Sequence, residues 1–198
     1  MRKRAASTCG PARVVAKPAP GGAGVALRPA SGADADWIAA LHTNSWQRNY
    51  RGSYSDAFLD ERLASDRQAL WRERLTAPGS AARTLIAERG GESVAFVHVE
   101  LDADPQFGAL VDNLHVRHDV QRSGIGKMLL TEVARIVATE RPGSARYLWV
   151  LQANAAAIAF YRAAGGTFVG SAPLAPPGGD QANLCGNPTK LRVVWGAL

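Results

Sequence analysis

The chain alternates short apolar runs with longer segments in which apolar residues recur at helical spacing. In residues 33–49, Trp37, Leu41 and Trp46 follow that spacing, which predicts a helix. The predicted elements in chain order are strand 25–29, helix 33–49, one or two helices over 55–75, strands 84–87, 93–101 and 109–116, helix 124–139, strand 147–151, helix 154–164, strand 167–170, a loop or loosely formed strand pair over 171–190, and strand 191–195.

This order of elements constrains the sheet. A helix lies between the strands 109–116 and 147–151, and such a unit predicts two parallel neighbouring strands with a right-handed connection. The turn at Gly90-Gly91 joins the strands 84–87 and 93–101 and predicts that they form an antiparallel hairpin. We therefore expect an α/β fold of the α+β type, built on one mixed sheet.

The distribution of charge divides the chain into two parts. Hydrophobic residues make up 46% and charged residues 20%, which is typical of a globular protein. The basic residues of segment 1–24, which has no acid, are Arg2, Lys3, Arg4, Arg13 and Lys17. They contribute +5 to the net charge of +6, which leaves +1 for residues 25–198. We expect a disordered basic extension at 1–24 and a single domain at 25–198.

Composition also limits the partners and the compartment. The near-neutral domain argues against nucleic acid as a partner, and only the extension leaves that rival reading open. No run approaches the roughly eighteen apolar residues that a membrane span needs. Cys9 and Cys185 make neither a disulfide framework nor a metal site, which favours the cytoplasm. The extension lacks the apolar core of a signal peptide. It could instead be a transit peptide, or an extension that results from a misassigned start codon.

A glycine-containing loop joins one predicted strand to the next predicted helix. Gly124 and Gly126 let backbone N–H groups approach a ligand, and the helix N-terminus adds partial positive charge. Together they predict a site for phosphate or pyrophosphate. Met128 and Gln121 exclude a Walker A loop, and Leu129 excludes a dinucleotide fingerprint.

Two motifs indicate which phosphorylated ligand this is. Residues 121–126 fit Gln/Arg-x-x-Gly-x-Gly/Ala, and Asn154 later opens a short helix that ends with Phe-Tyr before a Gly and an aromatic residue. In this order and separation, the motifs resemble the signatures of the GNAT superfamily of acyl-CoA N-acyltransferases, closely over residues 92–170. The resemblance implies acetyl-CoA as the cosubstrate and CoA as the product. It also implies a mostly antiparallel sheet whose one parallel strand pair is splayed at the acyl-CoA site, with helices on both faces.

The same resemblance implies roles for individual residues. The strand before the loop pairs with pantetheine, and the loop N–H groups bind the pyrophosphate. Asn154 caps its helix and either binds pantetheine or holds the loop. The residues predicted to bind the cofactor are Leu114, His115, Val116, Gln121, Arg122, Ser123, Gly124, Ile125, Gly126, Lys127, Asn154 and Tyr161. Tyr161 is the candidate general acid, because a phenol with a pKa near 10 suits a thiolate leaving group. The alternative is a core tyrosine packed beside Phe160.

The general base is predicted on the strand that precedes the loop. With a period of two, the side chain of Asp112 shares a face with Leu114 and Val116. A carboxylate there can take the proton of the amine directly or through water. Asp112 could instead cap a turn. The alternative bases are Glu100, His115 and, as the weakest, His98.

By resemblance, the acceptor site lies between residues 43–60 and 171–190. Trp46, Tyr50 and Tyr54 could line it, although their four-residue spacing also fits a packed helical stripe. No histidine lies near Cys185 in the sequence, so we expect no covalent acyl-enzyme.

These inferences predict an N-acetyltransferase that moves the acetyl group of acetyl-CoA to a primary amine. The amine belongs to a small molecule or a protein, and attacks directly in a ternary complex. The alternative is a non-catalytic acyl-CoA-binding sensor or regulatory module, and Tyr161 favours the enzyme. We expect no metal, nucleic acid or membrane partner; a homodimer, common in the resembled family, is left open.

Overall fold

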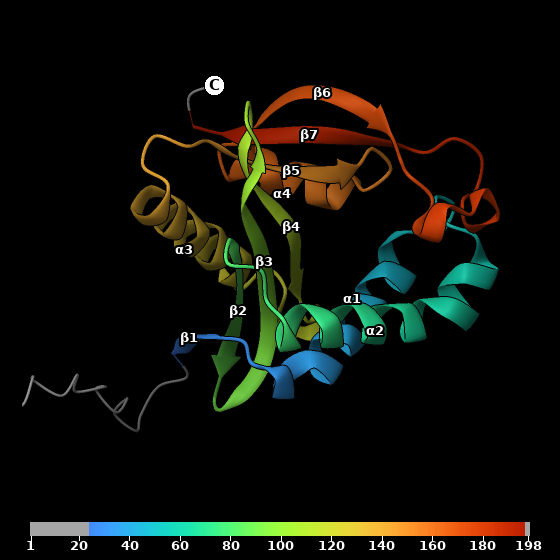
Figure 1. The fold of residues 1–198 in the computed structure, drawn as a ribbon. Helices are drawn as coiled ribbons and strands as arrows, with labels where there is room; N and C mark the ends of the chain where they lie inside the picture. The colour runs from blue at the N-terminus through green and yellow to red at the C-terminus, as the bar shows by residue number, and fades with distance from the viewer. Residues whose placement is uncertain (1–23, 197–198) are drawn as a thin grey trace, which may run out of the picture.

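The structure, a computed structural model, describes residues 24–196 (Figure 1). The predicted extension at 1–24 lies outside the described residues apart from Gly24. The strands are β1 (Val25–Pro29), β2 (Ala82–Arg89), β3 (Glu92–Asp104), β4 (Gly108–Val116), β5 (Arg146–Leu151), β6 (Thr167–Pro173) and β7 (Thr189–Trp195). The helices are α1 (Ala35–Asn49), α2 (Leu63–Thr76), α3 (Ile125–Glu140) and α4 (Ala155–Ala163).

All seven strands form one sheet in the order β1-β2-β3-β4-β5-β7-β6. Neighbouring strands are antiparallel except for β4 and β5, which are parallel. The prediction of a mixed sheet with one parallel pair is therefore confirmed. The parallel pairing is confined to Ala109↔Arg146 and Leu110↔Tyr147. Beyond Leu110, β4 has a strand neighbour only in β3, so the sheet is open on that side.

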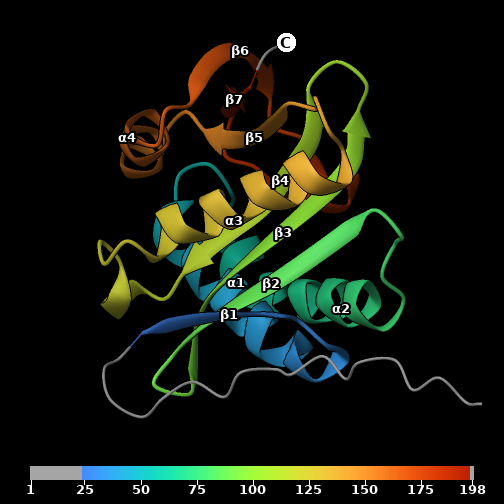
Figure 2. The ribbon, with the colours of Figure 1, turned by 90° about the vertical axis from the view of Figure 1, so that its left-hand side faces the viewer.

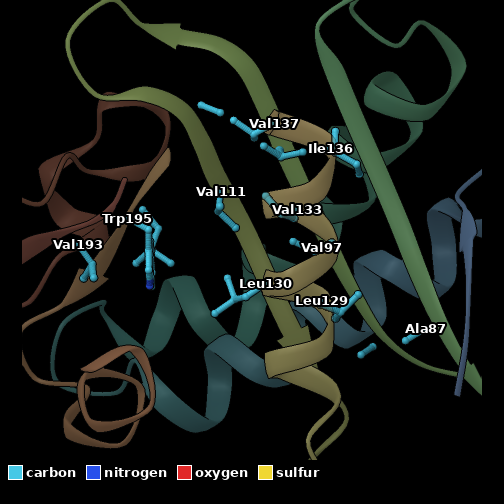
Figure 3. Close-up of a cluster of buried hydrophobic side chains, with 14 of the residues drawn as sticks. Ala87, Val97, Val111, Leu129, Leu130, Val133, Ile136, Val137, Val193 and Trp195 are labelled. Atoms are coloured by element: carbon cyan, nitrogen blue, oxygen red, sulfur yellow. The ribbon is translucent and has the colours of Figure 1, made fainter. Parts of the chain in front are cut away.

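Helices cover both faces of the sheet. Figure 2 shows α3 lying across one face, with α1 and α2 behind the other. α3 is apolar at helical spacing because Ile125, Leu129, Val133 and Ile136 all turn toward the sheet, where they are at most 7% exposed. Figure 3 shows this core, in which α3 packs against strand residues such as Val111. Burial of each such side chain contributes roughly 1.5–3 kcal/mol.

The opposite face has a second core with a polar contact inside it. Trp71 of α2 is fully buried, and its Nε1 donates to Nδ1 of His42 in α1 at 3.0 Å. That bond makes Nδ1 an acceptor, so a neutral His42 carries its proton on Nε2. Among the described residues, His42 Nε2 is buried without a hydrogen-bond partner. The two helices are thereby fixed to each other beside β4.

Several boundaries differ from the predicted ones. The segment predicted as one or two helices over 55–75 has a π turn at Phe58–Arg62 that continues directly into α2. β6 extends to Pro173, three residues past the prediction, because it pairs with β7 along its length. After β6 the chain forms short 3-10 turns at Pro177–Gly179 and Gln181–Asn183. No helix within residues 24–196 is long and apolar enough to cross a membrane.

Candidate functional site

The loop between β4 and α3 presents a row of free backbone donors. Arg122 has φ +60° and Gly124 has φ +87°, so the chain turns twice through left-handed conformations before α3 begins. Within residues 24–196, none of the backbone N–H groups of residues 122–127 has an acceptor. Because unpaired N–H groups at a helix N-terminus attract anions, the loop fits a phosphate or pyrophosphate.

Two polar side chains of the loop are used to hold its shape. Gln121 Nε2 donates to the carbonyl of Val116 at 3.2 Å, and Ser123 Oγ donates to the carbonyl of Val120 at 2.6 Å. Both bonds tie the loop back to the chain before it. The hydrogen bonding of these two residues therefore supports the loop, while its N–H groups remain unpaired.

The two glycines of the loop are needed for different reasons. Gly124 has a positive φ, and a Cβ there would meet nothing within 4 Å, so its requirement is conformational. A Cβ on Gly126 would lie 3.1 Å from Cζ of Phe160 in α4. Gly126 therefore lets α3 approach α4, which brings the loop close to the helix that carries Tyr161.

An open strand edge lies beside this loop. The N–H of Arg117 donates to Val94 in β3 at 2.8 Å. Because successive residues of a strand point their N–H and C=O groups to opposite sides, those of Val116 and Leu114 point away from β3, into the gap before β5. The side chains of Leu114 and Val116 pack on the core beneath α3. The edge predicted to pair with pantetheine is thus present as backbone that lacks a strand partner.

The helix after β5 places Asn154 and Tyr161 near this gap. Asn154 Oδ1 accepts from the N–H of Ala157 at 3.0 Å, which confirms the predicted cap of α4. The Tyr161 ring packs edge-on against Trp195, with centroids 6.0 Å apart. Its hydroxyl has no hydrogen-bond partner among the described residues, and burial, aided by Tyr50, raises its pKa above the ordinary value. The hydroxyl is therefore protonated at neutral pH and free to donate.

Asp112 does not share a face with Leu114 and Val116, so the predicted alternation is wrong here. The pairing of β3 and β4 passes from His98↔Asn113 to Val99↔Val111, which makes Asp112 the extra residue of a β-bulge. The bulge shifts the alternation by one residue. Asp112 consequently faces α2, on the side of the sheet opposite α3 and Leu114.

Two donors orient the carboxylate of Asp112. Arg74 Nη1 of α2 donates to its Oδ2 at 2.7 Å, and Asn113 Nδ2 donates to the same oxygen at 2.6 Å. Within residues 24–196, the other oxygen, Oδ1, has no partner. Arg74 lies 38 residues earlier in the chain, and no sequence signal linked the two.

The other candidate bases are held in separate contacts. His115 is 8% exposed and bonds Ser45 Oγ through Nδ1 at 2.9 Å. Burial lowers the pKa of His115 to about 4, although nearby Asp112 opposes the shift. His98 bonds Thr84 Oγ1 at 2.7 Å and Glu100 Oε1 at 2.8 Å. Burial lowers the pKa of His98 as well.

The predicted acceptor-lining aromatics form one cluster. Trp46 lies 5.0 Å from Tyr50 and 4.9 Å from Tyr54, measured between ring centroids. They are not a helical stripe, because α1 ends at Asn49 and only Trp46 lies on it. Burial raises the pKa of Tyr50 to about 12, and it raises the pKa of Tyr54 too. The cluster is a packed wall beside Leu151 of β5.

A hollow of about 390 Å³ lies next to that wall. Gly52 and Ser53 line it from the connection after α1. Cys185, in the segment before β7, and Thr189, the first residue of β7, line it from the other side of the sequence. The two segments predicted to form the acceptor site therefore meet in one depression. Gln152 and Ala153, which sequence reasoning missed, complete its floor.

Comparison with known proteins finds relatives of this chain. The sequence profile of the acetyltransferase (GNAT) family matches residues 42–166. A probable N-acetyltransferase of Mycobacterium tuberculosis is 28% identical over 141 residues, which cover 69% of this chain and 76% of that protein.

Solved structures share the fold at low sequence identity. The PaiA N-acetyltransferase of Thermoplasma acidophilum, solved with coenzyme A, has a TM-score of 0.69 and 17% identity, covering 87% of this chain and 99% of its own. YncA of Salmonella typhimurium, solved with acetyl-CoA, has a TM-score of 0.60 and 17% identity, covering 87% of this chain and 94% of its own.

Proposed function

Because the chain belongs to the acetyltransferase (GNAT) family, whose members are acyl-CoA-dependent enzymes, we propose that it transfers the acetyl group of acetyl-CoA to a primary amine. The row of unpaired N–H groups at residues 122–127, beside the open edge of β4, carries this proposal. Acetyl-CoA supplies the activated thioester. The amine belongs to a small molecule or a protein and reacts in a ternary complex.

The loop and the strand edge divide the binding of the cofactor between them. The N–H groups of Arg122 to Lys127, with the positive end of α3, bind the pyrophosphate. The side chains of Arg122 and Lys127 have no ion-pair partner among the described residues and can add charge. The backbone groups of Leu114 and Val116 pair with the pantetheine arm as an added strand.

Tyr161 provides the proton for the departing thiolate. Its unpaired hydroxyl lies on α4, which packs through Phe160 against Gly126 of the loop formed by residues 122–127, called the anion loop below. Burial keeps the hydroxyl protonated, since the raised pKa lies above neutral pH. A general acid in that state donates only when the sulfur develops negative charge.

Asp112 receives the proton of the amine, directly or through water. Its Oδ2 is held by Arg74 and Asn113, which leaves Oδ1 as the free acceptor. Asp112 lies on the face of the sheet that carries α1 and α2, opposite α3. The amine thus approaches from that face, past the wall of Trp46, Tyr50 and Tyr54.

Calorimetric titration with acetyl-CoA, CoA and ATP tests the proposal. Micromolar binding of acetyl-CoA and CoA without binding of ATP is expected, and turnover with a panel of amines should follow. Absence of binding would remove the proposed cofactor. Binding without turnover on any amine would favour the non-catalytic acyl-CoA-binding module.

A further inference from the structure

The face of β5 and β7 that lies opposite α3 carries an unusual set of side chains. Leu148 and Val150 of β5 belong to the core under α3, so Trp149 and its neighbours at period two face the other way. Arg192 of β7 lies directly across from Trp149, and Lys190 lies directly across from Leu151. Both cations are therefore on the same face as the acceptor wall.

Aromatic rings form the floor beneath these two cations. The guanidinium carbon of Arg192 lies 3.7 Å from the ring centroid of Phe107 and 4.5 Å from that of Trp149. Nζ of Lys190 lies 4.5 Å from the centroid of Trp149. Phe107, Tyr147, Trp149, Lys190 and Arg192 are called the cationic patch below.

In the described part of the chain, no carboxylate is paired with the cationic patch, although Arg192 is near enough to help lower the pKa of Asp104. Within residues 24–196, neither Lys190 nor Arg192 has a carboxylate within the 4.0 Å of an ion pair, whereas Arg72 and Arg74 of α2 each have one. Arg192 Nε is buried and has no hydrogen-bond acceptor. Burial and the neighbouring Arg192 lower the pKa of Lys190. Two partly desolvated cations with unused donors favour an anion.

The position of the cationic patch relates it to the proposed reaction. Leu151, the cross-strand neighbour of Lys190, packs with Tyr54 of the aromatic wall. Asp112 is near enough to raise the pKa of Lys190, against the effect of burial. Within the described residues, the apolar cluster around the rings of the cationic patch contains no helical residue. Its members are Phe107, Leu110, Ala145, Tyr147, Trp149 and Val194. The face therefore offers a carboxylate and a pair of cations near each other, beside the partly buried Phe107, Leu110 and Trp149.

We propose that the cationic patch binds an anionic group, a carboxylate or a phosphate, on the amine acceptor. The inference rests on the proposed function, because it assigns a substrate class to that same site. An acceptor with an ammonium at one end and an anion at the other matches Asp112 and the two cations in charge. Arg192 can donate two parallel N–H bonds to such a group, and Lys190 adds a point charge.

Matched pairs of amines test the inference. γ-Aminobutyrate is compared with γ-aminobutyramide, and phosphoethanolamine with ethanolamine, so that each pair differs in the anionic group. We expect kcat/KM to be about 10- to 100-fold higher for the anionic member of at least one pair, the range for hydrogen bonds to charged groups. A preference confined to one pair identifies carboxylate or phosphate as the anion.

Variants connect the preference to the cationic patch. Lys190→Gln and Arg192→Gln should each reduce the preference about tenfold or more, and Arg192→Lys should restore part of it. Arg162→Gln is the matched control, because Arg162 also lies over a ring, that of Phe168 at 5.3 Å, but on α4. It should leave the preference unchanged.

The outcomes separate the two proposals. If wild-type protein binds acetyl-CoA and acetylates both members of each pair equally well, the cationic patch does not select anions and the inference is overturned. Where no probe is turned over, calorimetry measures the binding of the same pairs to the CoA-loaded protein. Equal binding of both members of each pair, or no binding, likewise overturns the inference. Failure to bind acetyl-CoA would instead remove the proposed function.

Discussion

Among single residues, Tyr161 has the most direct role in the proposed reaction. Tyr161→Phe removes only the hydroxyl and leaves the ring against Trp195. We expect kcat to fall about 10²-fold or more, as for loss of a general acid, with the Kd of acetyl-CoA nearly unchanged. Steady-state kinetics and calorimetry measure the two quantities. An unaltered kcat would exclude Tyr161 from proton transfer.

Asp112 is tested by a substitution that preserves its shape. Asp112→Asn should lower kcat/KM about 10²-fold near neutral pH. The loss should shrink as the pH approaches the pKa of the amine, since the acceptor then arrives deprotonated. Asp102→Asn is the control, because Asp102 is also paired with an arginine, Arg141, at 2.6 Å. Equal losses for the two variants would mean that Asp112 acts through structure.

Gly124 can be separated from an ordinary left-handed glycine. Gly124→Ala and Gly143→Ala both place a Cβ in open space at φ +87° and +82°, so each should destabilise its local conformation by roughly 1–2 kcal/mol. Only Gly124 lies in the anion loop. We expect acetyl-CoA binding to weaken about tenfold in Gly124→Ala and to be unchanged in Gly143→Ala. Calorimetry decides, and equal affinities would remove the loop from binding.

Among the elements, β4 shows how one extra residue redirects chemistry. Without the bulge, Asp112 would lie over α3 with Leu114, away from any acceptor that approaches from α1 and α2. With it, Asp112 reaches Arg74, and His115 reaches Ser45 of α1. The bulge therefore separates the proposed cofactor edge of β4 from its proposed acceptor face within a few residues.

The contact between α1 and β4 should make stability depend on pH. The rings of His42 and His115 lie 4.7 Å apart, and burial lowers the pKa of both. Because the folded pKa of His115 is about 4 and the ordinary value is 6.5, the unfolded chain binds the proton first as pH falls. The neutral His115 ring therefore contributes about 3 kcal/mol to the unfolding free energy. This contribution is complete above pH 6.5 and is lost as the pH falls from 6.5 to about 4.

Urea denaturation at pH 7 and at pH 4.5 measures this loss. His115→Asn should reduce the difference between the two pH values. His118→Gln, at an exposed ring outside the core, should leave the difference as in the wild type. An undiminished difference in His115→Asn would show that other groups cause the acid sensitivity.

For the whole molecule, we expect acetyl-CoA binding to raise the unfolding free energy whether or not residues 1–23 are present. Every group of the candidate site lies within residues 24–196. A chain lacking residues 1–23 should therefore bind acetyl-CoA with unchanged affinity. At a hundred times its Kd, acetyl-CoA should add about 2.7 kcal/mol to the unfolding free energy of both chains.

Thermal or urea unfolding with and without acetyl-CoA compares the two chains. Weaker binding by the shortened chain would assign the segment to the site. The same shortened chain tests the alternative that the protein binds nucleic acid through its basic N-terminal segment. That alternative requires an affinity for nucleic acid that depends strongly on salt and is lost when the basic residues are removed.

The sequence by itself determined the features that depend on local pattern. The period of apolar residues in α3 and the strand–helix–strand order predicted a mixed sheet with one parallel pair, and the family model then confirmed the resemblance seen in two short motifs. The cap at Asn154 was predictable for the same reason, because its hydrogen bond joins residues three apart. Such features need only neighbours along the chain.

Tertiary structure decided whatever depends on contacts between distant residues. A period of two assigned Asp112 to the wrong face, because a bulge is set by the pairing of two strands and not by the residues of one. Gly126 faces Phe160, Asp112 faces Arg74, and Lys190 lies beside Trp149, with no signal in the intervening sequence. Packing alone brings these groups together, so the partners of Asp112 and the cationic patch could be derived only from the fold.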